Sequence, residues 1–333
     1  MSNEECERVT SETLEQGATG SLGGRGRRLS TGRLGDRLFG ASARGSGILL
    51  LLIIAAIAVF LIAKALPALR ADKANFFTSQ EWNPDAAQPR FGILQLVWGT
   101  LLSSFMALIL ATPVAIGIAL FIAFYSPRQL ASGLGYVVDL LAAVPSVVYG
   151  LWGLQFFVPK MASVANFLHD DVGWFPLFGG DSVGGQSILT ASVVLAIMIL
   201  PIISSISREV FLQVPRANVE AALALGATRW EVIRMAVLPF GRSGMVSAAM
   251  LGLGRALGET IAVAMVLSTA SGISLRILRP GGNTFAANIA NTFGMAGNTG
   301  RGALIASGLV LFVITLVVNM LARAIVARRK EFV

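Results

Sequence analysis

The chain has 333 residues, and only 13% of them are charged: 26 Lys and Arg against 18 Asp and Glu, a formal net charge of +8. About a quarter of the residues of a soluble domain are charged, whereas the mean hydropathy of this chain is +0.73. These values exclude an ordinary soluble protein and indicate an integral membrane protein. The basic residues lie mostly between hydrophobic runs, so we interpret them as a topology signal rather than as nucleic-acid binding.

Residue counts also exclude several kinds of chemistry. The single cysteine, Cys6, cannot form an internal disulfide, and with only one histidine, His169, Cys-based and two-His metal sites are implausible. None of the lysines follows a glycine, so no Walker A loop exists and any nucleotide hydrolysis must come from another chain. We expect no catalytic residue, no metal and no bound cofactor here.

The predicted elements begin with residues 1–46, which are rich in Gly, Ser, Thr, Glu and Arg, show no hydrophobic period and are expected to form a disordered cytoplasmic tail. A transmembrane domain is expected over 47–327, followed by a short cytoplasmic tail at 328–333. Each membrane helix needs about 20 apolar residues. Six stretches meet that length, at about 47–69, 96–125, 136–158, 184–206, 243–268 and 302–326.

Basic residues predict the orientation of these spans. With the N-terminus inside, 17 of the 26 Lys and Arg fall on the cytoplasmic side and seven on the outer side. The positive-inside rule therefore places both termini in the cytoplasm. In the outer loop 269–301, the stretch 284–290 could form one short helix. The fold class that we expect is all-α, a polytopic membrane protein with six transmembrane helices.

The inner loop 208–240 is the only cytoplasmic loop with room for structure. A helix ending near Gly226 is expected, because glycine supplies the left-handed conformation of a helix C-terminus. Thr228 followed three residues later by Glu231 predicts a capping box that starts a second helix. Two short helices joined in this way could dock on a partner and transmit a rigid push. An ordinary amphipathic pair at the membrane surface is an equal alternative on the residues alone.

One cation is predicted to lie deep in the membrane. Arg255 is 13 residues past Arg242 in the fifth span, about 20 Å along a helix. Because an intramembrane arginine is costly, it should face the bundle interior or a wet cavity. Glu259, four residues on, shares its face and can pair with it. The guanidinium suits an oxyanion, whereas the alternative is an ion pair that only fixes helix packing.

Two glycines flank this arginine. Gly254 and Gly258 form a small-x-x-x-small pair, which predicts close approach of another helix. That helix could belong to this chain or to a partner subunit.

Three motifs together resemble a known family. The run Glu220-Ala221-Ala222, then Gly226 and Leu238-Pro239, resembles the EAA motif of ABC importer permeases. The runs 145–150 (Pro-Ser-Val-Val-Tyr-Gly) and 254–260 (Gly-Arg-Ala-Leu-Gly-Glu-Thr) narrow the resemblance to the phosphate-specific transport family. The segments 81–84 and 91–92 look more like its PstC-type subunit than the PstA-type one. The resemblance covers about residues 48–327.

The resemblance implies a type I ABC importer permease in a bacterial cell membrane, surrounded by lipid. Its partners would be a second permease subunit (PstA-type), an ATP-binding subunit dimer (PstB-type) and an extracytoplasmic phosphate-binding protein (PstS-type), with no nucleic acid. Arg255 and Glu259 are then expected in the substrate pathway. The contact with the ATPase is expected at Glu220, Ala221, Ala222, Gly226 and Arg229.

Other interpretations stay open on the sequence. The same architecture could carry another oxyanion, such as molybdate or sulfate. A channel or an ion-coupled secondary transporter is also possible, although no inverted repeat of the kind found in many such transporters is visible. A signalling scaffold that reports phosphate status is a further alternative.

Overall fold

The computed structural model describes residues 31–174, 177–179, 184–268, 272–274 and 276–328. The chain divides into two compact units, Met1–Ile57 and Ala58–Val333. Helix α2 (Thr31–Ala71) begins well before the predicted first span at 47. Good helix formers such as Arg37, Leu38 and Ala41 extend the helix that the apolar run sustains. Of the predicted disordered tail, residues 1–30 lie outside the described residues, and 31–46 are helical instead.

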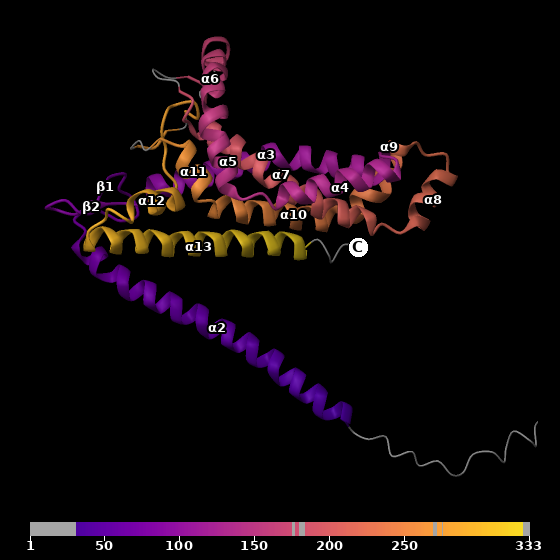
Figure 1. Ribbon diagram of the computed structural model, residues 1–333, viewed down its shortest axis with the longest axis horizontal. Helices are drawn as coiled ribbons and strands as arrows, with labels where there is room; N and C mark the ends of the chain where they lie inside the picture. The colour runs from indigo at the N-terminus through magenta and orange to yellow at the C-terminus, as the bar shows by residue number, and fades with distance from the viewer. Residues whose placement is uncertain (1–30, 175–176, 180–183, 269–271, 275, 329–333) are drawn as a thin grey trace, which may run out of the picture. The chain divides into compact units, whose positions relative to one another are not determined.

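The second unit is almost entirely helical (Figure 1). After the end of α2, the chain forms a hairpin of two short antiparallel strands, β1 (Trp82–Asn83) and β2 (Arg90–Phe91). Helices α3 to α13 follow, with three short π-helical segments, η1 to η3. The bounds are α3 Leu94–Leu120, η1 Phe121–Tyr125, α4 Arg128–Ala142, α5 Ser146–Trp152, η2 Gly153–Phe157, α6 Val158–Val172, α7 Ile188–Leu212, α8 Arg216–Ala224, α9 Arg229–Val232, η3 Ile233–Val237, α10 Leu238–Gly258, α11 Ile261–Val266, α12 Phe285–Thr292 and α13 Asn298–Arg328.

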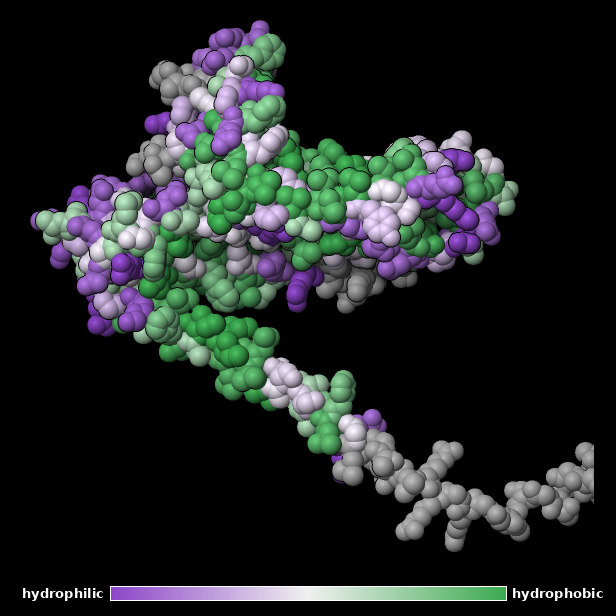
Figure 2. Space-filling model, viewed as in Figure 1, coloured by the Kyte–Doolittle hydropathy of each residue, from purple (hydrophilic) through white to green (hydrophobic). Residues whose placement is uncertain are grey.

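Length and composition identify five helical stretches able to cross a membrane within the described residues, or six if one bent pair is a single span. The five are Gly35–Ala71, Leu94–Tyr125, Ile188–Leu212, Arg229–Gly258 and Asn298–Ala324. The expected short helix at 284–290 is present as α12, with Thr284 as its N-cap. On the face seen in Figure 2, apolar residues cover the bundle, and hydrophilic residues gather towards α8 and towards the hairpin.

The predicted third span, 136–158, is not one straight helix. The stretch Arg128–Ala142 and the stretch Ser146–Val172 meet at a bend of 87°. Pro145 is the N-cap of α5, and a proline disfavours helical conformation in the residue before it and clashes with the preceding turn. Helix α6 begins at Val158, where the predicted third span ends.

The core of the unit is the seam between α3 and α7. Alanines recur every fourth residue on the buried face of α3, at Ala107, Ala111, Ala115 and Ala119, and each is at most 1% exposed. Such a stripe lets two helix backbones approach closely, as is common in membrane proteins, where small residues mark helix interfaces. Branched and sulfur-containing residues of α7, including Leu195, Met198, Ile199 and Ile203, fill the seam.

The hairpin is fixed to the start of the last span. Both carboxylate oxygens of Asp85 accept hydrogen bonds from backbone amides, Gly297 N at 2.9 Å and Gly300 N at 2.8 Å. An added Cβ at Gly300 would overlap the Asp85 carboxylate, so glycine is required for this approach. An acidic group stabilises a helix N-terminus because it meets unpaired N–H groups and the positive end of the dipole. Asp85 therefore anchors α13.

Candidate functional site: the α8–α9 turn and the α10–α11 break

The turn between α8 and α9 has the local structure that its sequence predicts. Gly226 has φ of 83°, in the left-handed region, and its amide donates to Leu223 O at 2.9 Å. Thr228 is the N-cap of α9, and its hydroxyl accepts from Glu231 N at 3.4 Å. The Glu231 carboxylate accepts in return from Thr228 N at 2.7 Å, which completes the capping box. These predictions are confirmed.

Two boundaries of the predicted inner loop change. Arg208 lies inside α7, which continues to Leu212, so the loop begins later than 208. The second predicted short helix is not separate, because α9 runs through η3 into α10 as one stretch, Arg229–Gly258. A push on α9 is therefore applied directly to a membrane-spanning helix. This is a shorter mechanical path than two free-standing helices would provide.

The turn is exposed at its tip and anchored at its base. Leu225 is 89% exposed and Trp230 57% exposed, although both are large and apolar. At the base, Ile233 and Val237 are buried against Phe211 and Val214, at and just beyond the end of α7. Large apolar side chains are thus exposed at the tip of a segment whose base is packed against the end of α7. Glu220, Ala221, Ala222 and Arg229 lie on this same α8–α9 segment.

The α10 helix ends at Gly258, and this break changes the predicted geometry around Arg255. Glu259 has extended backbone, with φ of −68° and ψ of 125°, and a new short helix, α11, starts at Ile261. The Glu259 carboxylate accepts from Ala262 N at 3.2 Å, so its oxygen caps α11. None of the ion pairs within the described residues joins Arg255 to Glu259. The predicted pair is wrong because the two residues do not share one continuous helix.

Arg255 stands half-buried in the last turn of α10, between the fully packed residues Leu253 and Ala256. It has no carboxylate within ion-pair distance among the described residues. Its guanidinium is near enough to Tyr149 of α5 to act electrostatically on that hydroxyl. The five N–H donors of an arginine without an acidic partner are suited to an oxyanion.

Two of the motifs that carried the family resemblance meet at this break. An added Cβ on Gly150, in the 145–150 run of α5, would lie 3.0 Å from Ala262 Cα and 2.9 Å from Met265 Sδ, both on α11. The α5 backbone therefore packs directly on α11, immediately beyond the 254–260 run. Tyr149 is fixed in turn by donating to Leu141 O at 3.0 Å. Residues more than a hundred positions apart thus surround one helix break.

The two glycines of the small-x-x-x-small pair have different surroundings. A Cβ on Gly254 would lie 3.8 Å from Asn319 Oδ1 on α13, an ordinary contact with a helix of this chain. A Cβ on Gly258 would meet nothing within 4 Å. Of the two alternatives for the approaching helix, this chain supplies a neighbour at Gly254, and the surface at Gly258 is open.

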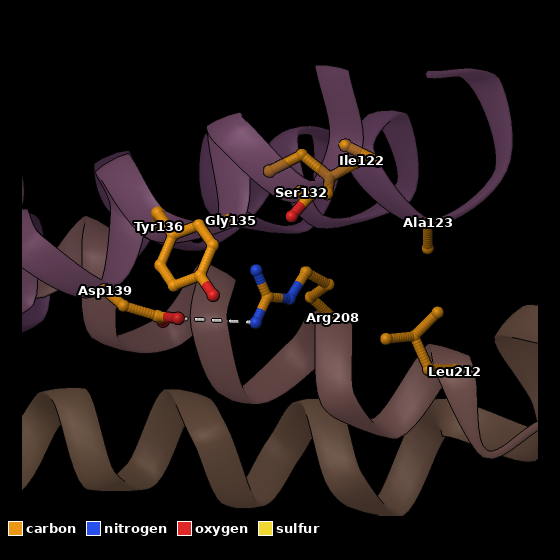
Figure 3. A pocket seen from close by; sticks show the side chains of 9 residues that line it. Ile122, Ala123, Ser132, Gly135, Tyr136, Asp139, Arg208 and Leu212 are labelled. Atoms are coloured by element: carbon orange, nitrogen blue, oxygen red, sulfur yellow. Dashed lines mark hydrogen bonds and ion pairs between the residues drawn. The ribbon is translucent and has the colours of Figure 1, made fainter. Parts of the chain in front are cut away.

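A further charged cluster joins α4 to α7, and the sequence analysis gave it no role (Figure 3). Arg208 Nη2 donates to Asp139 Oδ2 at 3.5 Å and to Glu209 Oε1 at 2.9 Å, and Ser205 Oγ donates to Asp139 Oδ1 at 2.6 Å. The Arg208 side chain is only 15% exposed, and its guanidinium lies over Gly135, where a Cβ would overlap Nη1. A pocket of about 390 Å³ opens beside it.

This cluster links the first half of the broken span to the last part of α7, where Arg208 lies four residues before the end of the helix at Leu212. Its sequence signal was an acidic residue, Asp139, inside a hydrophobic stretch, since intramembrane charges are rarely without a role. The partner could not be read from spacing, because Asp139 and Arg208 are 69 residues apart.

The fold and these sites define a class: a multi-pass helical permease whose exposed turn continues into a membrane span. Residues 115–331 match the family model described as "Binding-protein-dependent transport system inner membrane component", and the chain belongs to this family of inner-membrane proteins. This match confirms the predicted ABC importer permease, the all-α polytopic fold class and the multi-pass membrane location. The orientation of the termini stays a prediction.

Relatives support the same assignment. The chain is 51% identical over 298 residues to "Phosphate transport system permease protein PstC 2" of Mycobacterium tuberculosis, covering 88% of this chain and 92% of that protein. It is 50% identical over 295 residues to "Phosphate transport system permease protein PstC" of Mycobacterium leprae, covering 87% and 92%. The fold is similar to that of a bacterial ABC transporter involved in the import of the acidic polysaccharide alginate, with a TM-score of 0.52 at 17% identity over 88% of this chain and 99% of that one.

Proposed function

We propose that this chain is the transmembrane permease subunit of an ATP-driven importer of inorganic phosphate and forms half of the translocation pathway. The names of relatives about half identical over nearly their full length support the substrate. The observation that carries the proposal is Arg255: a half-buried guanidinium at a helix break in a membrane span, with no carboxylate partner among the described residues.

In this proposal Arg255 contacts the phosphate during transport. A guanidinium offers a planar fork of donors that matches two phosphate oxygens. Glu259 works in the pathway by fixing the break: its carboxylate caps α11, which starts at Ile261, just after α10 ends at Gly258. This role does not require Glu259 to pair with Arg255, and none of the ion pairs within the described residues joins the two.

The α8–α9 turn is proposed as the contact with the ATP-binding subunits. The residues assigned to it are Glu220, Ala221, Ala222, Gly226 and Arg229. The direct continuation of α9 into α10 supports this role, because movement of the turn is transmitted along the helix that carries Arg255. ATP would be hydrolysed by the partner dimer, since this chain has no Walker A loop. A change of Arg255 surroundings between states gives phosphate two affinities, which uphill transport requires.

The remaining partners and the orientation follow from the same proposal. A second permease subunit would complete the pathway, and the open surface at Gly258 is a candidate contact for it. An extracytoplasmic phosphate-binding protein would dock at the hairpin end of the bundle. Both termini would lie in the cytoplasm, as the distribution of Lys and Arg predicts. Neither another oxyanion nor ion-coupled transport is favoured by any observation on this chain.

Radiolabelled phosphate uptake tests the proposal. In cells whose only phosphate importer carries Arg255→Ala, we expect uptake to fall by at least about 30-fold, because removing one partner of a desolvated charge contact costs about 2 kcal/mol or more. Arg255→Lys, which keeps the charge and loses the planar fork, should be intermediate. Arg242→Ala is the matched control: an exposed arginine at the start of the same helix.

Assembly is checked by co-purification of the ATP-binding subunits with each variant. Normal uptake by an assembled Arg255→Ala transporter would show that the guanidinium is not in the phosphate path.

A further inference from the structure

A groove with two cations lies between the end of α2 and the start of α13, wholly within the second unit. It has a volume of about 440 Å³, and its lining includes Lys64 and Ala68 of α2, Phe293, and Asn298, Thr299 and Arg301 of α13. The helices cross closely just beneath it: an added Cβ on Gly302 would lie 2.7 Å from Ala68 Cβ and 3.2 Å from Lys64 O. The groove is therefore part of a fixed helix crossing.

The groove lies near one boundary of the membrane. Lys64 is seven residues, about 10 Å, before the C-terminal end of the candidate span Gly35–Ala71. Arg301 is in the first turn of the candidate span Asn298–Ala324. In the topology that the basic residues predict, the first span ends and the last span begins on the outer side, so both cations reach the same membrane surface. At that depth a long basic side chain extends its charge towards the headgroups.

Neither cation is neutralised within the described part of the chain. No carboxylate is among the lining residues of the groove, and neither residue takes part in an ion pair. Each rests against an aromatic ring: Lys64 Nζ is 5.9 Å from the centre of the Phe60 ring, and Arg301 Cζ is 5.9 Å from that of Phe293. An anion from outside the chain could therefore bind in the groove and neutralise the two cations.

The surroundings of the groove identify the kind of anion. Apolar side chains of α2 next to Lys64 are exposed, with Phe60 at 58%, Ile62 at 49% and Leu66 at 42%. A free inorganic anion gains nothing from contact with these apolar side chains. A lipid, in contrast, can place its acyl chains on them and its headgroup between the cations. Thr299 and Asn298 add a hydroxyl and an amide that can donate to phosphate oxygens.

We propose that this groove binds the headgroup of an anionic phospholipid, with its phosphodiester between Lys64 and Arg301. The bound lipid would hold the end of the first span against the start of the last one. The site is separate from the pathway at Arg255, and the proposal does not depend on the identity of the transported anion.

Native mass spectrometry of the full-length chain, released from detergent with added phosphatidylglycerol, tests this site. The test variant is Lys64→Gln with Arg301→Gln. Each basic residue near a membrane surface contributes about fivefold to the attraction of anionic lipid, so the double variant should bind phosphatidylglycerol about 25-fold more weakly. Lys160→Gln is the matched control, because Lys160 also rests on a ring, that of Phe156 at 3.6 Å, but lies outside the groove. It should bind like the unmodified chain.

The alternatives give different results. Phosphatidylcholine carries the phosphate without net charge, so it should bind the unmodified chain no more tightly than it binds the double variant. Inorganic phosphate should not displace phosphatidylglycerol from the unmodified chain. Displacement by inorganic phosphate would overturn the lipid assignment in favour of a free anion. Unchanged phosphatidylglycerol binding in a double variant with an unaltered circular dichroism spectrum would remove the site altogether.

Discussion

The α8–α9 turn and the α10–α11 break both interrupt helices, but they are stabilised in different ways. The turn has an exposed tip, and its conformation is set by Gly226 and by hydrogen bonds between residues three positions apart. The break is half-buried, and its surroundings come from α5, α7 and α13 as well as from its own sequence. A turn set by local bonds can move as a rigid body, whereas a break set by neighbouring helices changes whenever those helices move.

This difference suits the two roles that we propose for these regions, the contact with the ATP-binding subunits and the contact with phosphate. The contact with an ATPase should keep its shape while it is displaced, because it transmits force. The contact with substrate should change its shape, because ligand must bind with different affinity in the two states. The helix Arg229–Gly258 connects the two regions, so a displacement of the turn is transmitted to the break.

Apart from the loss of uptake expected for Arg255→Ala, the largest effect is expected at the turn. Gly226→Pro should reduce phosphate uptake about tenfold or more while ATP hydrolysis by the assembled complex continues, since proline cannot adopt positive φ and removes the amide that donates to Leu223 O. Uptake and ATPase activity measured in the same proteoliposomes give the ratio. Gly294→Ala is the control, a glycine with open surroundings and without positive φ. Intact coupling in Gly226→Pro would mean that the turn is not the coupling element.

A smaller effect distinguishes capping from ion pairing at the break. Glu259→Ala should lower the free energy of unfolding by about 1 kcal/mol, the usual loss for a helix cap. Glu259→Gln keeps an oxygen that can accept from Ala262 N and should retain most of that stability. Thermal unfolding of the two purified variants, followed by scanning fluorimetry, makes the comparison. Equal destabilisation by Gln and Ala would favour a charge interaction and restore the pairing that we rejected.

The features that could be predicted from the sequence are those set by neighbouring residues, as in the turn. The cap at Thr228, the glycine at 226 and the short helix after Thr284 depend on residues within one turn of one another, so their patterns sufficed. The membrane class followed from composition alone.

The features that the sequence did not predict are contacts between distant residues and the points at which helices end. The 87° bend at Pro145 and the end of α10 after Gly258 turned two predicted continuous spans into broken ones. Arg255 was found because an intramembrane charge is conspicuous, but its surroundings were not, since they come from a run near residue 150. The cluster of Asp139 with Arg208 was missed for the same reason.

The most direct test of the account asks whether water and anions reach the position of Arg255. Because Cys6 is the only native cysteine, Cys6→Ser provides a background in which Arg255→Cys is the single thiol of this chain. In the assembled transporter, a small anionic methanethiosulfonate should modify this thiol at a rate that changes when ATP is bound. Leu253→Cys, at a position 1% exposed on the same helix, should stay unmodified. If the thiol at 255 is as unreactive as the one at 253 in every nucleotide state, position 255 is sealed from the aqueous path. That result would contradict the proposal that Arg255 contacts phosphate during transport.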